Sequence, residues 1–287
     1  MTEAPPLARY AVIGNPIAHS RSPQIHAMFA EQTGKPLHYE RLLAPVDGFA
    51  QAVAAFVAEG GLGLNVTVPF KLDAYALAAG RLSSRARLAG AVNTLSWRDG
   101  AWHGCNTDGV GLVSDLLRLG VRLTGASVLL VGAGGAARGV LQPLAEAGCA
   151  RIHIVNRTAS KAEELAASWR ESGVSPQTAV TGGSLADAAL AGGWNLVINA
   201  TASGLQNAAP DLPPGLYAPG AAAYDMMYGA QPTAFMQQAQ ADGAALAADG
   251  LGMLVGQAAE SFYIWHGVRP DPAPVLAALR EALKAGQ

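Results

Sequence analysis

Charge and cysteine are both scarce in this sequence. Only 14% of the 287 residues are charged, against roughly 25% in an average globular protein, and the formal net charge is −2. This balance leaves no basic footprint for nucleic acid or for an anionic membrane surface. The two cysteines, Cys105 and Cys149, form neither a CxxC pair nor a disulfide framework, which indicates free thiols and a cytoplasmic location.

Long hydrophobic runs and metal-ligand spacings are missing as well. The charge-free stretch 188–210 is interrupted by polar residues and glycines, so it does not offer the roughly 20 apolar residues of a spanning helix. The first residues carry Glu3, Pro5 and Pro6 before any apolar run, which is not typical of a signal peptide. The six histidines show no paired spacing, so we expect no metal.

What the sequence does contain is an alternation of short apolar runs with helical patterns, typical of βαβ units and parallel sheets. The length favours two domains, which we expect to join near residues 108–125 and 245–255. Arg98-Asp99-Gly100 predicts a hairpin turn between strands 91–97 and 101–106. Other strands are expected at 10–13, 37–43, 63–66, 128–131, 152–155, 196–199, 221–224 and 244–247. Helices are expected at 22–31, 49–58, from Pro69, and at 109–119, 136–147, 161–170, 251–266 and 274–284, with a loop at 204–219.

A glycine-rich turn follows the predicted strand at 128–131. Gly132, Gly134 and Ala137 match the three positions of G-x-G-x-x-G/A, which permit a tight turn, close approach of a pyrophosphate, and close helix packing. The preceding strand and the following helix supply the context that this motif needs. We therefore predict dinucleotide binding; a merely tight strand–helix turn is the alternative.

The end of the next predicted strand indicates which dinucleotide binds. An acidic residue usually holds a free ribose 2′-hydroxyl, but Asn156-Arg157-Thr158 contains none, and Lys161 lies one turn further on. The planar guanidinium of Arg157 suits a 2′-phosphate, which favours NADP. Alternatively, Thr158 only caps a helix and Arg157 is solvated surface.

Two charged residues are candidates for chemistry. Lys71 lies at the start of a predicted helix, where the helix dipole disfavours a cation, as suits a lysine that exchanges protons; on position alone, an ordinary surface lysine is an equal alternative. Asp108 lies at the start of another predicted helix, where it could instead serve only as the helix N-cap. Polar residues inside apolar segments, each of which could instead be a satisfied core group, include Asn65, Thr67, Asn93 and Gln257. Ser20 and Ser22 precede a helix that they could also cap.

Several segments taken together resemble the shikimate dehydrogenase family over nearly the whole chain. The segments that carry this resemblance are Gly14–Pro23 (GNPIAHSRSP), Asn65–Lys71 (NVTVPFK), Gly90–Thr94 (GAVNT), Asn106–Gly109 (NTDG), Gly132–Ala137 (GAGGAA), Asn156–Thr158 (NRT), Asn199–Thr201 (NAT), Tyr224–Met226 (YDM) and Asp249–Gln257 (DGLGMLVGQ).

The resemblance implies a reversible NADPH-dependent reduction of 3-dehydroshikimate to shikimate, within chorismate and aromatic amino-acid biosynthesis. It implies an α/β fold of two domains with a cleft between them: an open substrate domain (1–107 plus 250–287) and a Rossmann-type NADP-binding domain (108–249). Lys71 and Asp108 would be the catalytic pair. The substrate would contact Ser20, Ser22, Asn65, Thr67, Asn93, Asp108, Tyr228 and Gln257. NADP would contact Gly132, Ala133, Gly134, Gly135, Ala136, Ala137, Asn156, Arg157, Thr158, Lys161, Thr201, Met226 and Gly250.

Some alternatives stay open beside this interpretation. Lys161 stands where the family often has arginine, so exclusion of NAD is less secure than preference for NADP. Serine at both Ser20 and Ser22 resembles shikimate-specific members, and a broader quinate/shikimate dehydrogenase is the nearest rival. A non-catalytic NADP(H)-sensing protein and a folate dehydrogenase are the others. The resemblance is compatible with a monomer or a homodimer.

Overall fold

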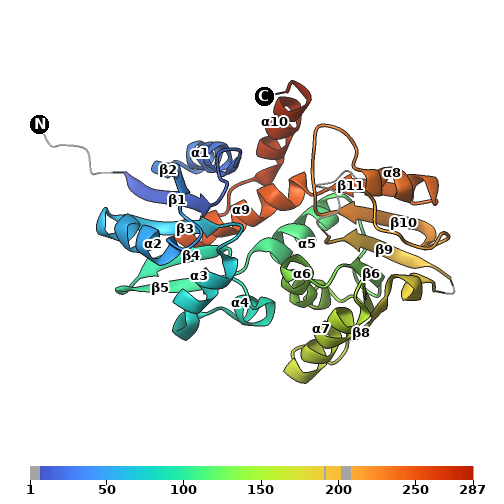
Figure 1. Ribbon diagram of the computed structural model, residues 1–287. Coiled ribbons are helices and arrows are strands. Elements are labelled where there is room, and N and C mark those ends of the chain that lie inside the picture. Colours follow the sequence, from blue (N-terminus) through green and yellow to red (C-terminus); the bar gives the residue numbers. More distant parts are fainter. Residues whose placement is uncertain (1–6, 191, 202–207, 287) are drawn as a thin grey trace, which may run out of the picture. The chain divides into compact units, whose positions relative to one another are not determined.

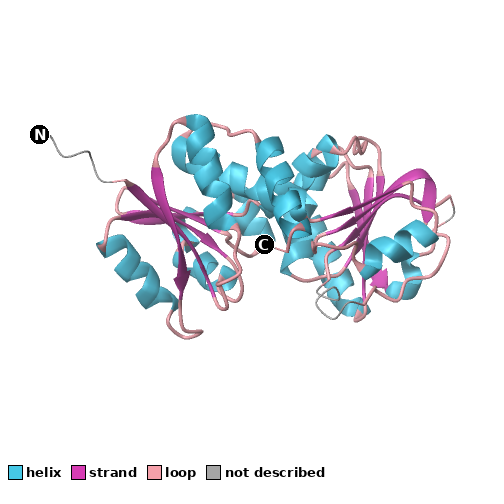
Figure 2. Ribbon diagram, turned by 90° about the horizontal axis from the view of Figure 1, so that it is seen from above, coloured by secondary structure: helices cyan, strands magenta, loops and turns pink. Residues whose placement is uncertain are grey.

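The computed structural model describes residues 7–190, 192–201 and 208–286, which fold into two compact units (Figure 1). Unit 1 contains residues 1–107 and 257–275, and unit 2 contains residues 108–256 and 276–287. Each unit is built on its own sheet, with helices on both sides of the strands (Figure 2). Within the described ranges, no helix is both long enough and apolar enough to cross a membrane.

Unit 1 has a mixed five-stranded sheet. Its strands in spatial order are β2 (Leu37–Leu43), β1 (Ala8–Gly14), β3 (Gly61–Val66), β4 (Thr94–Arg98) and β5 (Ala101–Cys105). The pairs of β1 with β2 and with β3 are parallel, whereas β4 is antiparallel to both of its neighbours. The predicted hairpin is confirmed: Asp99 and Gly100 have φ of 51° and 71°, the positive values that a two-residue turn between twisted strands requires.

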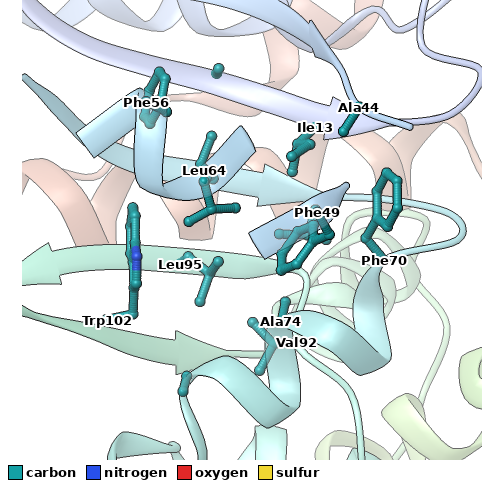
Figure 3. Packing of buried hydrophobic residues seen from close by; sticks show 14 of the residues in the cluster. Ile13, Ala44, Phe49, Phe56, Leu64, Phe70, Ala74, Val92, Leu95 and Trp102 are labelled. Carbon is teal, nitrogen blue, oxygen red and sulfur yellow. The ribbon is translucent and has the colours of Figure 1, made fainter. Parts of the chain in front are cut away.

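The helices of unit 1 cover this sheet. They are α1 (Ser22–Thr33), α2 (Phe49–Ala58), α3 (Lys71–Leu77), the 3₁₀ turn η1 (Ala79–Arg81), α4 (Ser84–Ala89) and most of α9 (Leu251–His266). One core lies between the sheet and α2 to α4, where the rings of Phe49 and Phe70 stack with centroids 5.2 Å apart (Figure 3). Leu64 and Leu95 point into the same core from β3 and β4.

Unit 2 has a six-stranded sheet in which every pair is parallel. The spatial order is β11 (Leu246–Asp249), β10 (Tyr217–Asp225), β9 (Trp194–Asn199), β6 (Ser127–Val131), β7 (Arg151–Asn156) and β8 (Ala179–Ser184). Its helical elements are α5 (Asp108–Arg118), α6 (Gly135–Glu146), α7 (Ala159–Ser172), η2 (Leu185–Ala188), α8 (Ala234–Ala241) and most of α10 (Pro272–Lys284). The order reverses at β6, next to the glycine-rich turn, which is the arrangement of a Rossmann-type sheet.

The elements differ from the sequence expectations in a few places. The helix expected from Pro69 begins at Lys71, and the peptide bonds before Pro16 and Pro69 are cis. The loop expected at 204–219 ends earlier, because β10 begins at Tyr217; residues 204–207 lie outside the described residues. Helices α4 and α8 and strand β8 were not expected.

The C-terminal helices are divided between the units. The sequence-based division assigns all of 250–287 to the first domain, whereas unit 2 of the structure includes residues 250–256 and Leu276 onward. Arg280 of α10 is the physical reason, because its guanidinium pairs with both carboxylate oxygens of Asp249 at the end of β11. The domain boundaries stay a prediction.

Candidate functional site

In unit 1, the candidate residues follow the carboxyl ends of the two central parallel strands. Gly14 ends β1, and Thr67 follows β3, with its backbone N–H donating to Ile13 O at 3.0 Å. A Cβ on Gly14 would lie 2.5 Å from the Thr67 methyl group, so only glycine lets the two loops approach this closely. Lys71 begins α3 four residues after Thr67 and is half-buried.

Ser20 and Ser22 form a hydroxyl pair at the start of α1. The Ser20 hydroxyl donates to Ser22 Oγ at 3.2 Å, and Ser22 N donates to Ser20 Oγ at 3.3 Å. No side chain at Arg21, the N-cap residue, caps the helix. Arg41 of β2 holds the loop in place, since its Nε and Nη2 donate to the carbonyl oxygen of Ser20 at 3.0 and 2.7 Å.

Asn65, near the end of β3, is buried and hydrogen-bonded on both sides of its amide. Its Oδ1 accepts from the Tyr39 hydroxyl at 2.7 Å and lies 3.1 Å from Nε2 of His26. Its Nδ2 donates to Ser261 Oγ at 2.9 Å, with Thr94 Oγ1 at 3.4 Å. The side chain therefore joins α1 and β2 to β4 and α9.

A second amide lies on the other side of this group. The Oδ1 of buried Asn93 accepts from Thr107 N at 2.9 Å and from the Thr94 hydroxyl at 2.9 Å. Its Nδ2 donates to Thr107 Oγ1 at 2.9 Å and lies 3.4 Å from Gln257 Oε1. Thr107 is fully buried, so this network fixes the amide planes of Asn93 and Gln257 before any ligand arrives.

In unit 2, the glycine-rich turn connects β6 to α6 as predicted. Gly132 has φ of 109°, a conformation that favours glycine, while Ala137 is fully buried. Gly134 is the N-cap residue of α6 and supplies no side-chain cap. A Cβ on Gly134 or on Gly135 would meet no atom within 4 Å, so the space above the turn is open.

These features fit a pyrophosphate. The first N–H groups of α6 have no side-chain cap, and they lie at the positive end of the helix dipole, where an anion is stabilised. The absence of side chains at Gly134 and Gly135 leaves the approach clear.

Asn199 and Asp225 organise the loops after β9 and β10. Asn199 Oδ1 accepts from Thr201 N and Oγ1 at 3.1 and 2.7 Å, and its Nδ2 donates to Asp225 Oδ1 at 3.1 Å. Burial raises the pKa of Asp225, although donors including Thr233 partly offset this effect. These bonds set the positions of Thr201 and of Met226, the residue after Asp225.

Gly250 follows β11 in the same region of unit 2. Its N–H donates to Met227 O at 2.9 Å, and a Cβ on it would lie 2.2 Å from Met226 O. The two segments can therefore approach only because residue 250 is glycine.

Arg157, Thr158 and Lys161 are exposed after β7. Thr158 is the N-cap residue of α7, but its side chain makes no capping bond. The Asn156 amide donates to Thr158 O at 2.9 Å and so shapes this loop. The helix-cap alternative therefore does not account for Thr158. Arg157 in the loop and Lys161 in the first turn of α7 are two exposed cations four residues apart.

The predicted residues fall into two groups. Unit 1 contains Ser20, Ser22, Asn65, Thr67, Lys71, Asn93 and Gln257, and unit 2 has the predicted cofactor residues at or just after the carboxyl ends of its strands. Asp108 is the first residue of α5, and Tyr228 is 37% exposed after β10, both in unit 2. Sequence reasoning assigned no role to the polar residues His26, Tyr39, Thr94 and Ser261 and considered Thr107 only as a helix cap, although Thr94 and Thr107 lie in the GAVNT and NTDG segments.

Three family models match separate stretches of the chain. Residues 12–95 match the shikimate dehydrogenase substrate binding domain, 115–203 match shikimate / quinate 5-dehydrogenase, and 250–280 match the shikimate 5'-dehydrogenase C-terminal domain. A curated relative, shikimate dehydrogenase (NADP(+)) of Bordetella petrii, is 76% identical over 99% of both chains. The chain belongs to the shikimate dehydrogenase family.

Solved structures that are similar to this chain have the same architecture. Shikimate 5-dehydrogenase of Thermus thermophilus in complex with NADP(H) and shikimate is 35% identical, with a TM-score of 0.83 over 96% of this chain and 100% of that one. An Ael1 enzyme from Pseudomonas putida is 42% identical, with a TM-score of 0.87 over 95% and 98%. The match to the shikimate dehydrogenase substrate binding domain contains Ser20 to Asn93, so the polar network of unit 1 lies largely inside it.

Proposed function

We propose that this chain catalyses the reversible, NADPH-dependent reduction of 3-dehydroshikimate to shikimate, a step toward chorismate and the aromatic amino acids. The observation that carries the proposal is the preformed hydrogen-bond network of buried Asn93 and Thr107 with half-buried Gln257, in a chain 76% identical to a shikimate dehydrogenase (NADP(+)). A polyhydroxylated ring needs many oriented donors and acceptors, and the preformed amides of unit 1 offer them.

The substrate is held by neutral polar groups of unit 1. The hydroxyls of Ser20 and Ser22 bind its carboxylate, in a loop that Arg41 holds through the carbonyl oxygen of Ser20. Thr67, Asn93 and Gln257 bind its ring hydroxyls. Tyr228 of unit 2 supplies a further contact. Asn65 has its amide bonded by protein groups on both sides.

Lys71 and Asp108 are the proposed catalytic residues. Oxidation of the alcohol releases a proton from the hydroxyl at C3, and reduction of the ketone needs one at the same oxygen. Lys71 takes or gives this proton and neutralises the charge that develops on the oxygen. Asp108 accepts a hydrogen bond from a neighbouring ring hydroxyl and so orients the substrate.

NADP is the proposed cofactor, and when bound it accepts or donates the hydride. The N–H groups at the start of α6, with Ala133, Gly134, Gly135 and Ala136, hold its pyrophosphate. Arg157 and Lys161 bind the 2′-phosphate, with Asn156 and Thr158 shaping their loop. Thr201, Met226 and Gly250, at the ends of three neighbouring strands, complete the binding surface.

The test is formation of reduced cofactor by the purified protein, with shikimate or quinate crossed against NADP⁺ or NAD⁺. We expect fast turnover only with shikimate and NADP⁺. Comparable rates with quinate or NAD⁺ would instead indicate the broader quinate/shikimate enzyme. If NADP⁺ binds and no pairing turns over, the protein is a cofactor sensor or acts on another substrate.

A further inference from the structure

The strongest unassigned feature is the imidazole of His26, which is fully buried in unit 1 beside Asn65. Its ring stacks on Tyr39 at 4.3 Å with planes 7° apart. Its Nδ1 has no hydrogen-bond partner among the described residues, so the single N–H of a neutral ring lies on Nε2. There it faces Asn65 Oδ1 at 3.1 Å.

The orientation of the Asn65 amide follows from its neighbours. The single proton of the Ser261 hydroxyl goes to the carbonyl oxygen of Gln257 at 3.0 Å or to Thr94 Oγ1 at 2.8 Å, so toward Asn65 this hydroxyl accepts. Asn65 therefore turns Nδ2 to Ser261 and Oδ1 to Tyr39 and His26, which both donate to it. Both lone pairs of the oxygen and at least one N–H of the amide are thus committed within the protein.

Asn65 is also the junction between two parts of the substrate site. On one side, the Tyr39 hydroxyl is hydrogen-bonded to Ser22, which is paired with Ser20. On the other side, Ser261 and Thr94 lead to Asn93, Thr107 and Gln257. A shift of the Asn65 amide therefore disturbs both the Ser20–Ser22 hydroxyl pair and the Asn93–Gln257 group.

We propose that His26 is a positioning residue for substrate binding: its Nε2–H fixes the amide of Asn65, and Asn65 aligns the serine pair with the Asn93–Gln257 group without itself contacting the substrate. This inference rests on the proposed function for the substrate, but it assigns Asn65 a different role from the one that the family resemblance implies. The buried ring stays neutral because burial lowers its pKa to about 3.

Two substitutions separate the hydrogen bond from ring packing. His26→Gln keeps an N–H donor at nearly the position of Nε2 and loses the ring, whereas His26→Phe keeps the stacked ring and loses the donor. We expect His26→Gln to behave nearly as wild type. We expect His26→Phe to raise the shikimate KM about tenfold, as for loss of one buried hydrogen bond, with kcat and the NADP⁺ KM nearly unchanged.

The matched control is His103→Phe. His103 lies on β5 of the same sheet, and its Nε2 has no hydrogen-bond partner within the described part of the chain. We expect this variant to leave the shikimate KM unchanged. Thermal unfolding of each variant separates lost positioning from lost folding. If His26→Phe does not fold, Tyr39→Phe removes the other donor to Asn65 Oδ1 and is expected to raise the same KM.

A double-mutant cycle tests whether His26 acts through Asn65. In an Asn65→Ala background, His26→Phe should add no further loss of shikimate affinity, measured by calorimetry. Losses that multiply would overturn the proposal, as would equal effects of His26→Gln and His26→Phe or a wild-type KM in His26→Phe.

Shikimate analogues that lack one ring hydroxyl at a time test whether Asn65 contacts the substrate. As a positioning residue, Asn65→Ala should weaken every analogue by the same factor. A loss that disappears for one analogue would identify a direct contact and overturn this part of the inference. Wild-type protein that neither binds nor oxidises shikimate overturns the proposed function together with this inference, whereas normal wild-type binding with an unaffected His26→Phe overturns this inference alone.

Discussion

The candidate residues of unit 1 are side chains whose polar atoms are already bonded to one another, whereas the turn of unit 2 offers backbone N–H groups and open space. Asn93 and Thr107 are buried and share three hydrogen bonds, while Gly134 and Gly135 are exposed. The substrate site therefore depends on which side chains are present, and the cofactor site depends on which are absent.

This difference has an energetic reason. A small ring carrying several hydroxyls is recognised through hydrogen bonds of defined direction. The side chains that make these bonds must be oriented before binding, and a buried hydrogen-bond network orients them. A pyrophosphate carries its charge on several oxygens, and the end of a helix stabilises it through backbone groups that every residue has. Substitutions in the two units should therefore impair activity in different ways.

The largest effect is expected for Lys71→Ala in unit 1. Removing a group that transfers a proton in the transition state should lower kcat by about 10² to 10⁴-fold, with much smaller changes in the KM of shikimate and NADP⁺. Steady-state kinetics with both substrates measures this split. Turnover close to wild type would remove Lys71 from the chemistry.

Gly134→Val tests whether cofactor binding in unit 2 depends on the absence of a side chain at the glycine-rich turn. Gly134 has φ of −84° and ψ of −170°, which any residue adopts, and a Cβ there meets nothing within 4 Å. We expect unchanged thermal stability and NADP⁺ affinity about 10- to 100-fold weaker, because the side chain blocks charge-assisted bonds to the phosphates. Gly80→Val, which also meets no atom within 4 Å but lies in unit 1, is the control and should leave NADP⁺ affinity intact.

The exposed cations after β7 give a smaller, more selective effect. Arg157→Ala should raise the NADP⁺ KM about 10- to 30-fold through loss of charged hydrogen bonds, and leave the NAD⁺ KM unchanged. Arg122→Ala, another exposed arginine of unit 2, controls for the loss of one positive charge. Equal losses for both cofactors would mean that Arg157 does not read the 2′-phosphate.

Most elements could be predicted from the sequence, and those that could not have local physical reasons. β8 (Ala179–Ser184) contains Gly182 and Gly183, which are untypical of strands. A Cβ on Gly182 would lie 2.3 Å from Ala162 O, so glycine is there because α7 packs closely on the strand. Helices α4 and α8 have only six and eight residues, too few for a clear period.

More of the site could be predicted from the sequence in unit 2 than in unit 1. A strand, a glycine motif and a helix are consecutive in the chain, so the turn of unit 2 could be recognised locally. The network of unit 1 joins residues as distant as Asn65 and Ser261, 196 positions apart. No local pattern distinguishes such a buried polar group from an ordinary core residue, and His26 therefore received no role.

The smallest effect concerns the stability of this network against acid. Burial lowers the pKa of His26 to about 3 in the folded chain, against about 6.5 when unfolded, so only the unfolded state takes up a proton between these values. Stability is therefore full above pH 6.5 and falls as the pH decreases toward 3. Between pH 6.5 and 5.5, protonation of His26 in the unfolded chain should lower the free energy of unfolding by about 1 kcal/mol. The His26→Gln variant should lack this decrease, so its curve of unfolding free energy against pH should be flatter there. Urea unfolding of both proteins at several pH values measures the difference, and parallel curves would show that the imidazole has the same pKa in the folded and unfolded states. Gly134→Val should leave the pH dependence of the unfolding free energy unchanged, because this substitution neither adds nor removes a titratable side chain.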